Sequence, residues 1–304
     1  MSPSNKTSDG RPGTESHPRP AHLASGWETL DQAARDAAYN NQAAVSDSAA
    51  LVDIRNRLSA TFRDRHADHL DLPYAAGDRC RWDLFPGAEA SAPCLVLIHG
   101  GWWHYNSREN FACCVAGALE CGWSAALPGY TLAPDASLTQ IVTEIGQALD
   151  WLADNGPRHG IAGPILLSGW SAGGHLAAMW IDHPLVCAGL AISGVFDLAP
   201  IRDTYINRAL QLTDTELATL SPARLQPSRK PLTVAYGDRE LPEMRRQSAD
   251  FAAWRQAHGC PGGSVAIAGA DHFRILDALS RRDGELMQVV ARLVDRAELP
   301  SSGS

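Results

Sequence analysis

The chain has 304 residues, of which 45% are hydrophobic and 20% are charged, values that are ordinary for a globular protein. Its formal net charge of -8 argues against a nucleic-acid-binding surface. No apolar run approaches the roughly 20 residues that cross a bilayer, so neither a nucleic-acid partner nor a membrane partner is expected.

The two ends of the chain differ in composition from the part between them. Residues 1–25 are rich in Ser, Pro, Gly and Thr and residues 298–304 are rich in Ser, so both are predicted to be disordered tails of a single domain at 26–297. The first segment lacks the apolar core of a secretory signal. The seven cysteines include no C-x-x-C pair, which indicates reduced thiols and predicts a cytoplasmic location.

Helical and strand patterns alternate between the two ends. In chain order, helices are expected at 31–38, 49–58, 109–120, 138–153, 175–180, 214–220, 243–258 and within 275–295. Strands are expected at 78–85, 94–98, 123–127, 164–168, 185–192, 232–236 and 264–268. The first strand alternates polar and apolar residues, which predicts one exposed face. The alternation of elements predicts an α/β fold with a mainly parallel sheet that is covered on both faces.

Residues 193–229 fit the alternation less well than the rest. The segment is too long for a simple connection between a strand and the next element, and its one clear helical pattern covers only 214–220. A long loop at this place is typical of a substrate-binding element. The segment is therefore predicted to be a short lid-like insertion.

Residues Gly169-Trp170-Ser171-Ala172-Gly173 match G-x-S-x-G, the nucleophile elbow of serine hydrolases. A short apolar run precedes the motif and a helical pattern follows it, which is the strand–turn–helix context that the motif requires. The glycines allow a turn sharp enough to expose the serine. Ser171 is therefore the predicted nucleophile.

A serine hydroxyl needs a base, and the base needs a carboxylate that orients it. In folds with this elbow the chain order is serine, acid, histidine. His272 directly follows the last expected strand and is the predicted base. The acid follows the strand that ends at Tyr236: the spacing from Gly237 favours Glu240, whereas the residue type favours Asp238, which stays the alternative.

The remaining requirement is a set of backbone N–H groups for the oxyanion. Ala172 follows the nucleophile and supplies one N–H group by position. His99-Gly100-Gly101-Trp102 follows an early buried strand, and Gly101 and Trp102 are expected to supply the others. No metal-ligand cluster, phosphate loop or dinucleotide fingerprint is found, so neither a metal nor a cofactor is expected.

These motifs together resemble the α/β-hydrolase fold and, within it, the kynurenine formamidase (arylformamidase) group. Five segments are similar to blocks of that family. They are the H-G-G-x-W motif with Trp103, the elbow, Ser193-Gly194-Val195-Phe196-Asp197-Leu198, the block that begins at Glu240, and Asp271-His272-Phe273. Eukaryotic members usually have Asp where this chain has Glu240. The resemblance covers roughly residues 30–290.

The resemblance implies hydrolysis of the small molecule N-formyl-L-kynurenine to kynurenine and formate by a serine triad. Trp103, and in the insertion Tyr205 and Asn207, are the predicted substrate-pocket residues, although core packing is an equal alternative for the tryptophan. The alternative function is a carboxylesterase that acts on small acyl or aryl esters. A binding protein without catalysis is a third hypothesis, which the complete triad disfavours. The sequence leaves a homodimer open.

Overall fold

The computed structural model describes residues 26–298. The predicted tails at 1–25 and 298–304 therefore lie outside the described residues, apart from Glu298, the last residue of helix α11. Within the described part of the chain, no helix is both long enough and apolar enough to cross a membrane.

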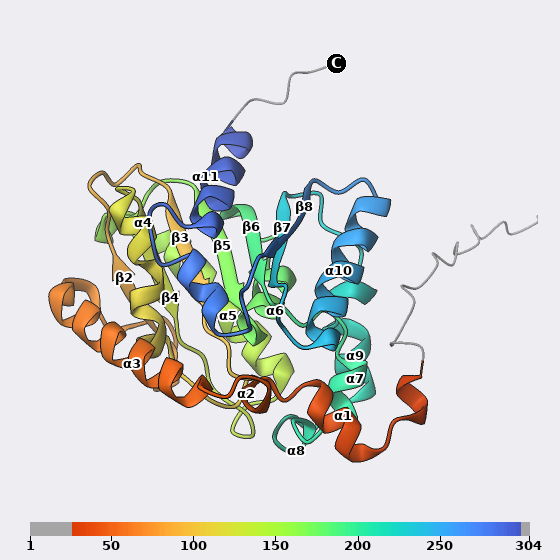
Figure 1. The fold of residues 1–304 in the computed structure, drawn as a ribbon. Coiled ribbons are helices and arrows are strands. Elements are labelled where there is room, and N and C mark those ends of the chain that lie inside the picture. The colour runs from red at the N-terminus through yellow and green to blue at the C-terminus, as the bar shows by residue number, and fades with distance from the viewer. Residues whose placement is uncertain (1–25, 299–304) are drawn as a thin grey trace, which may run out of the picture.

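An eight-stranded sheet forms the centre of the described structure, with the strand order β1-β2-β4-β3-β5-β6-β7-β8 (Figure 1). Strands β1 and β2 pair antiparallel, β2 also pairs antiparallel with β4, and all later pairs are parallel. The predicted, mainly parallel sheet is therefore confirmed. The strands are β1 Leu72–Pro73, β2 Arg81–Phe85, β3 Cys94–Ile98, β4 Ser124–Pro128, β5 Ile165–Trp170, β6 Val186–Ile192, β7 Leu232–Gly237 and β8 Gly262–Ile267.

Helices cover both faces of the sheet, as Figure 1 shows. Successive side chains of a strand point to opposite faces, so β3 divides its residues between two apolar cores: Val96 and Ile98 join one, Leu95 and Leu97 the other. The α-helices are α1 Gln32–Ala38, α2 Asn41–Ala44, α3 Ser48–Arg65, α4 Ala116–Glu120, α5 Leu138–Asn155, α6 Ala172–Met179, α7 Ala199–Arg202, α8 Asn207–Leu210, α9 Asp214–Thr219, α10 Pro242–Ala257 and α11 Glu285–Glu298.

One of the two cores lies under α5, α6 and α10, and the other under α4, α11 and two short 3-10 helices, η3 (Arg108–Val115) and η6 (Arg274–Ala278). Helix α5 shows why the chain folds this way locally. The side chain of Ser137 caps its first turn by accepting the N–H of Gln140 at 3.2 Å, and its apolar residues recur at helical spacing and are buried.

Strand β2 corrects the expectation of a half-exposed strand. All of its residues after Arg81 are buried, including the charged Asp83, which is 0% exposed. The carboxylate is accommodated because the guanidinium groups of Arg63 and Arg108 bind it. The polar residue Asp83 in this alternating pattern therefore belongs to a buried ion-pair cluster and does not face solvent.

The helix expected at 109–120 is also different. The chain forms the 3-10 helix η3 first and becomes α-helical only in α4, from Ala116 to Glu120. The insertion at 193–229 contains α7 and α8 as well as the expected helix α9. Four-residue helices such as α7 and α8 are too short to show a periodic pattern in the sequence.

The N-terminal segment packs against this insertion. The Trp27 indole donates to Asp203 Oδ2 at 3.1 Å, and the amide of Gln32 donates to the Asp203 carbonyl at 2.9 Å. The Tyr205 N–H donates to Asp36 Oδ1 at 2.7 Å. Helix α1 and the segment around Tyr205 are thus joined, although they are far apart in the sequence.

Candidate active site

The elbow joins β5 to α6 at Ser171, whose backbone has φ 58° and ψ −119°. A non-glycine residue in this region is strained, and such strain is found at functional sites. A Cβ on Gly169 would lie 2.0 Å from the carbonyl oxygen of Gly173, and a Cβ on Gly173 would lie 2.0 Å from that of Ile98. Both glycines of the motif are therefore required by close backbone contacts.

Three of the predicted catalytic side chains lie in one hydrogen-bonded chain. The Nε2 atom of His272 is 3.1 Å from Ser171 Oγ, and its Nδ1 atom is 2.9 Å from Glu240 Oε2. The three residues are between 2% and 5% exposed. They follow or end strands β5, β7 and β8, whose parallel carboxyl ends meet at one edge of the sheet.

The alternative acid, Asp238, lies elsewhere. Its side chain is exposed, and its Oδ1 atom accepts the N–H of Gly269 at 2.8 Å. This contact ties the two turns after β7 and β8 together. The geometry therefore brings Glu240, and not Asp238, to the imidazole.

The second oxygen of Glu240 is held by two donors. Its Oε1 atom accepts the Ser193 hydroxyl and the Gly237 N–H, each at 2.6 Å. Ser193 directly follows β6, is fully buried and has φ 50°. Sequence reasoning did not identify this serine as a site residue, although its place after a central parallel strand was a usable signal.

The imidazole also has an aromatic neighbour in the elbow. The ring centroids of Trp170 and His272 are 4.8 Å apart, and the indole N–H of Trp170 donates to the His272 carbonyl at 2.8 Å. The variable position of G-x-S-x-G therefore fixes the loop that carries the histidine.

The loop after β3 passes close to the nucleophile. A Cβ on Gly100 would lie 2.6 Å from the Trp170 carbonyl oxygen and 2.9 Å from Ser171 Cβ. Gly101 has φ 122° and Trp102 has φ 48°, and the N–H groups of these two residues donate no hydrogen bond to the rest of the described chain. Ala172 is the first residue of α6, so its N–H has no partner within the helix.

The two tryptophans of this loop are packed in the interior. Trp102 contacts Tyr39 edge-on at 6.0 Å between ring centroids, and Trp103 contacts His175 in the same way at 5.0 Å. Trp103 is 0% exposed, which fits core packing better than a substrate contact. Tyr39, which had no motif to reveal it, places the N-terminal segment against this loop.

The other two predicted pocket residues lie in the insertion. Tyr205 is half-buried, and the side-chain carbonyl of Asn207 accepts the Leu212 N–H at 2.8 Å. Both line a surface cavity together with Gln32 and Arg35. None of the triad residues lines that cavity.

Two further buried histidines make contacts of a different kind. Nε2 of His175 lies 2.7 Å from the Leu220 carbonyl oxygen, and Nδ1 of His99 lies 2.9 Å from that of Gly100. Burial lowers the pKa of His175 to about 4 and that of His99 to about 3, so both are neutral near pH 7. Neither has the carboxylate partner that His272 has.

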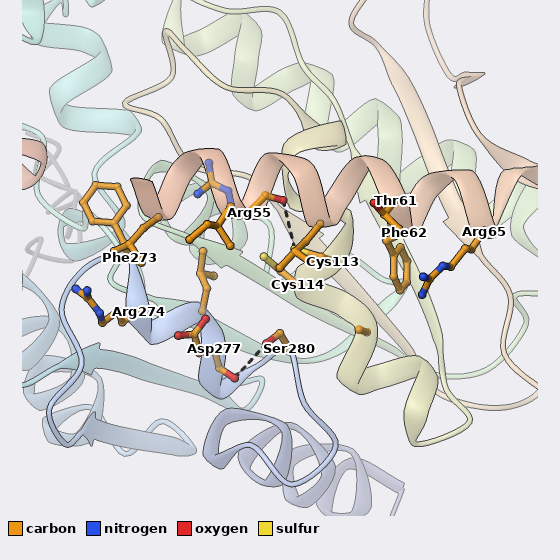
Figure 2. Close-up of a pocket in the computed structure, with 15 residues that line it drawn as sticks. Arg55, Thr61, Phe62, Arg65, Cys113, Cys114, Phe273, Arg274, Asp277 and Ser280 are labelled. Atoms are coloured by element: carbon orange, nitrogen blue, oxygen red, sulfur yellow. Dashed lines mark hydrogen bonds between the residues drawn. The ribbon is translucent and has the colours of Figure 1, made fainter. Parts of the chain in front are cut away.

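A second cavity, of about 480 Å³, lies between α3, η3 and η6 (Figure 2). Helix α3 runs along it, with Phe273 and Arg274 at one end and Arg65 at the other. Phe273 follows the catalytic candidate His272, but no residue of the triad or of the oxyanion loop lines this space. It is therefore separate from the candidate active site.

The chain is similar to proteins of known family. The BD-FAE family model matches residues 83–181. The chain is 26% identical to a kynurenine formamidase of Salmo salar over 245 residues, which cover 75% of this chain and 82% of the relative. It is 24% identical to a kynurenine formamidase of Danio rerio over 244 residues, with the same coverage.

Solved structures share the fold. A Silicibacter protein provisionally assigned as a thioesterase superposes with a TM-score of 0.76 at 28% identity, covering 84% of this chain and 98% of that one. An esterase of Mycobacterium marinum superposes with a TM-score of 0.69 at 18% identity, covering 90% and 98%. The chain is thus a hydrolase with an α/β-hydrolase fold, and it is similar to the kynurenine formamidases.

Proposed function

We propose that this protein hydrolyses the formyl anilide N-formyl-L-kynurenine to L-kynurenine and formate. The observation that carries the proposal is the hydrogen-bonded chain Ser171–His272–Glu240 in a protein that is similar to kynurenine formamidases. A serine, a base and an orienting carboxylate in this order are the groups that acyl transfer requires.

In the proposed reaction, Ser171 Oγ attacks the formyl carbon while His272 Nε2 accepts the hydroxyl proton. Glu240 accepts the hydrogen bond of the Nδ1–H group and stabilises the imidazolium as it forms. The N–H groups of Gly101, Trp102 and Ala172 bind the oxyanion of the tetrahedral intermediate. The predicted contacts of Tyr205 and Asn207 with the leaving group are part of the same proposal, whereas the fully buried Trp103 packs in the core and is left out of it.

The intermediate then collapses. The C–N bond breaks, His272 protonates the departing aniline nitrogen, and Ser171 retains the formyl group as an ester. Water attacks this ester while His272 accepts one of its protons, and the proton returns to Ser171 as formate leaves. The low exposure of the three side chains supports this exchange, because the electrostatic interactions that stabilise the imidazolium are stronger away from bulk water.

The second candidate function is a carboxylesterase for small acyl or aryl esters. The esterases among the solved structures favour it, and the same triad would perform it. An ester has a better leaving group than an anilide and is the easier substrate. The two functions therefore differ in the substrate, while the catalytic groups are the same.

The test is a kinetic comparison of N-formyl-L-kynurenine with p-nitrophenyl acetate, with Ser171→Ala as the control. We expect kcat/KM for the formamide of at least about 10^4 M⁻¹s⁻¹, within the usual range of enzymes. The variant is expected to lose roughly 10^5- to 10^6-fold in kcat, because it lacks the nucleophile. Turnover of the ester alone would overturn the formamidase proposal and support the carboxylesterase.

We further propose a cytoplasmic location, on the basis of the cysteine composition. Fractionation of cells that express the full chain tests it. Recovery with a cytoplasmic marker is expected, and recovery in an oxidising compartment would contradict it.

A further inference from the structure

The carboxylate of Glu240 is held at one oxygen and presents the other. Oε1 accepts the Ser193 hydroxyl and the Gly237 N–H at 2.6 Å each, whereas Oε2 lies 2.9 Å from His272 Nδ1. Short hydrogen bonds to an ionised acceptor are among the stronger ones. The two donors therefore determine where Oε2 lies and in which direction it faces.

Ser193 is itself held rigidly. It follows β6, its side chain is fully buried, and its N–H donates to the Ala235 carbonyl of β7 at 2.7 Å. Its φ of 50° lies in the left-handed region that favours glycine. A serine at such a position is strained, whereas a glycine would not be, so the hydroxyl is expected to make a contribution that offsets the strain.

We propose that Ser193 is a positioning residue of the hydrolase: its hydroxyl fixes the Glu240 carboxylate so that Oε2 faces the imidazole of His272. The inference rests on the proposed catalytic role of the triad. Ser193 does not touch the substrate or the reacting atoms, and it acts through Glu240.

The proposal gives a reason for a glutamate at this position. The side chain of Glu240 starts in the turn after β7 and extends to both Ser193 on the neighbouring strand end and His272 on the other side. Aspartate is one methylene shorter. With the backbone of this turn unchanged, Glu240→Asp cannot keep both contacts, so it is expected to lose one of them.

The experiment compares Ser193→Ala, Ser193→Gly and Ser193→Thr with the unmodified full-length protein. Alanine and glycine both remove the hydroxyl, but glycine also relieves the left-handed backbone, so that variant is expected to fold without difficulty. We expect both to reduce kcat for p-nitrophenyl acetate about tenfold with KM unchanged, because a group that acts on the transition state alone changes kcat. Ser193→Thr keeps the hydroxyl but adds a branched side chain at a left-handed residue, so its stability is expected to fall while its kcat per folded molecule stays near that of the unmodified protein.

Ser168→Ala is the matched control. Ser168 is also a fully buried serine at a parallel strand, but its hydroxyl donates to the backbone carbonyl of Leu190 at 2.9 Å and not to the triad. It should lose a comparable buried hydrogen bond without a change in kcat. Equal losses of kcat in Ser168→Ala and Ser193→Ala, or normal kcat in Ser193→Gly, would overturn the positioning role.

A second measurement separates this inference from the substrate proposal. A fluorophosphonate probe forms an O–P bond with Ser171 as the P–F bond breaks, fluoride leaves and His272 accepts the hydroxyl proton. The labelling rate, followed by mass spectrometry, is expected to fall about tenfold in Ser193→Gly and to stay unchanged in Ser168→Ala. If the protein is labelled but does not cleave the formamide, the substrate proposal alone fails. If Ser171 is not labelled at all, the proposed nucleophile and the role of Ser193 both fail.

Discussion

Two buried carboxylates in this molecule are bound in opposite ways. Asp83 in β2 accepts from Arg63 Nε at 2.8 Å, from Arg108 Nε at 3.0 Å and from the backbone N–H of Asp71 at 3.0 Å. Glu240 accepts from a hydroxyl, a backbone N–H and an imidazole. One carboxylate is therefore neutralised by permanent cations, and the other is bound by groups that carry no permanent charge.

The difference shows what each carboxylate is able to do. The two guanidinium groups compensate the charge of Asp83 permanently, so this carboxylate joins α3 and η3 to strand β2 and has no uncompensated charge for a further partner. The charge of Glu240 is compensated fully only when His272 becomes an imidazolium. A carboxylate that accepts from the Nδ1–H group holds the imidazole in the orientation and tautomer that leave Nε2 free to accept a proton, as a general base must.

The largest expected effect follows from replacing Glu240 with Gln. The amide oxygen can still accept from Ser193 and Gly237, so its NH₂ group then faces His272 Nδ1 and stabilises the wrong tautomer of the imidazole. We expect kcat to fall by about 10^4-fold, as for the corresponding change in other serine triads, with an unchanged fold. Steady-state kinetics on p-nitrophenyl acetate and circular dichroism measure the two parts of this prediction.

Asp238→Asn is the control for that change. It alters the other acidic residue of the same turn, whose side-chain oxygen accepts only the N–H of Gly269 and can do so as an amide. Its kcat should stay within about twofold of the unmodified protein, as is usual for an exposed substitution that keeps its hydrogen bond. Loss of activity in Asp238→Asn, with activity retained in Glu240→Gln, would reverse the assignment of the acid.

The second prediction concerns the other carboxylate. Asp83→Asn leaves the buried guanidinium of Arg108, which is 4% exposed, without its full charge partner. Breaking one member of a buried ion pair costs about 3–5 kcal/mol, and we expect the free energy of unfolding to fall by about that much. Urea denaturation measures it, while kcat per folded molecule should not change.

An Asp83→Asn protein of normal stability would show that Asp71 and Glu109, which also pair with Arg108, compensate its charge by themselves. A loss of kcat in the folded variant would contradict the separation between the two carboxylates. Either result would mean that the permanent cations around Asp83 are not what distinguishes it from Glu240.

Some features of the fold and of the candidate site could be predicted from the sequence, and others could not. The strand at 94–98 and the elbow could be predicted because burial on both faces leaves a continuous apolar run, and because the turn imposes glycines at fixed positions. Ser171, Glu240 and His272 were predicted from the chain order of serine, acid and histidine in folds with this elbow, and the carboxyl ends of the parallel strands bring them together. Residues 101 positions apart, Ser171 and His272, could therefore be paired without any coordinates.

Contacts that no rule of topology imposes could not be predicted. Asp83 was expected to be exposed because its cations come from 20 and 25 residues away, on elements whose packing the local pattern does not specify. Ser193 was not assigned to the site because its hydroxyl meets a carboxylate 47 residues later. Both are cases in which a polar side chain is buried with a distant partner, and local periodicity contains no information about that partner.

The smallest expected effect concerns His175, a histidine that is buried without a carboxylate. Burial lowers its pKa from an ordinary value of 6.5 to about 4, so the unfolded chain binds a proton near pH 6 that the folded protein does not bind. Above pH 6.5 the full free energy of unfolding is present, because the imidazole is then mostly neutral in both states. As the pH falls from 6.5 toward 4, the unfolded chain gains a proton that the folded protein does not, and the free energy of unfolding falls by up to about 1.4 kcal/mol per pH unit. His175→Gln should therefore reduce the difference in unfolding free energy between pH 7 and pH 5 by about 2 kcal/mol.

Urea denaturation of both proteins at the two pH values checks this prediction. His99, whose pKa is also lowered, is present in both proteins, so its contribution cancels in the comparison. An unchanged pH dependence in His175→Gln would show that the imidazole gains a proton in the folded state as readily as in the unfolded chain. In that case burial alone would not keep His175 neutral in the folded protein.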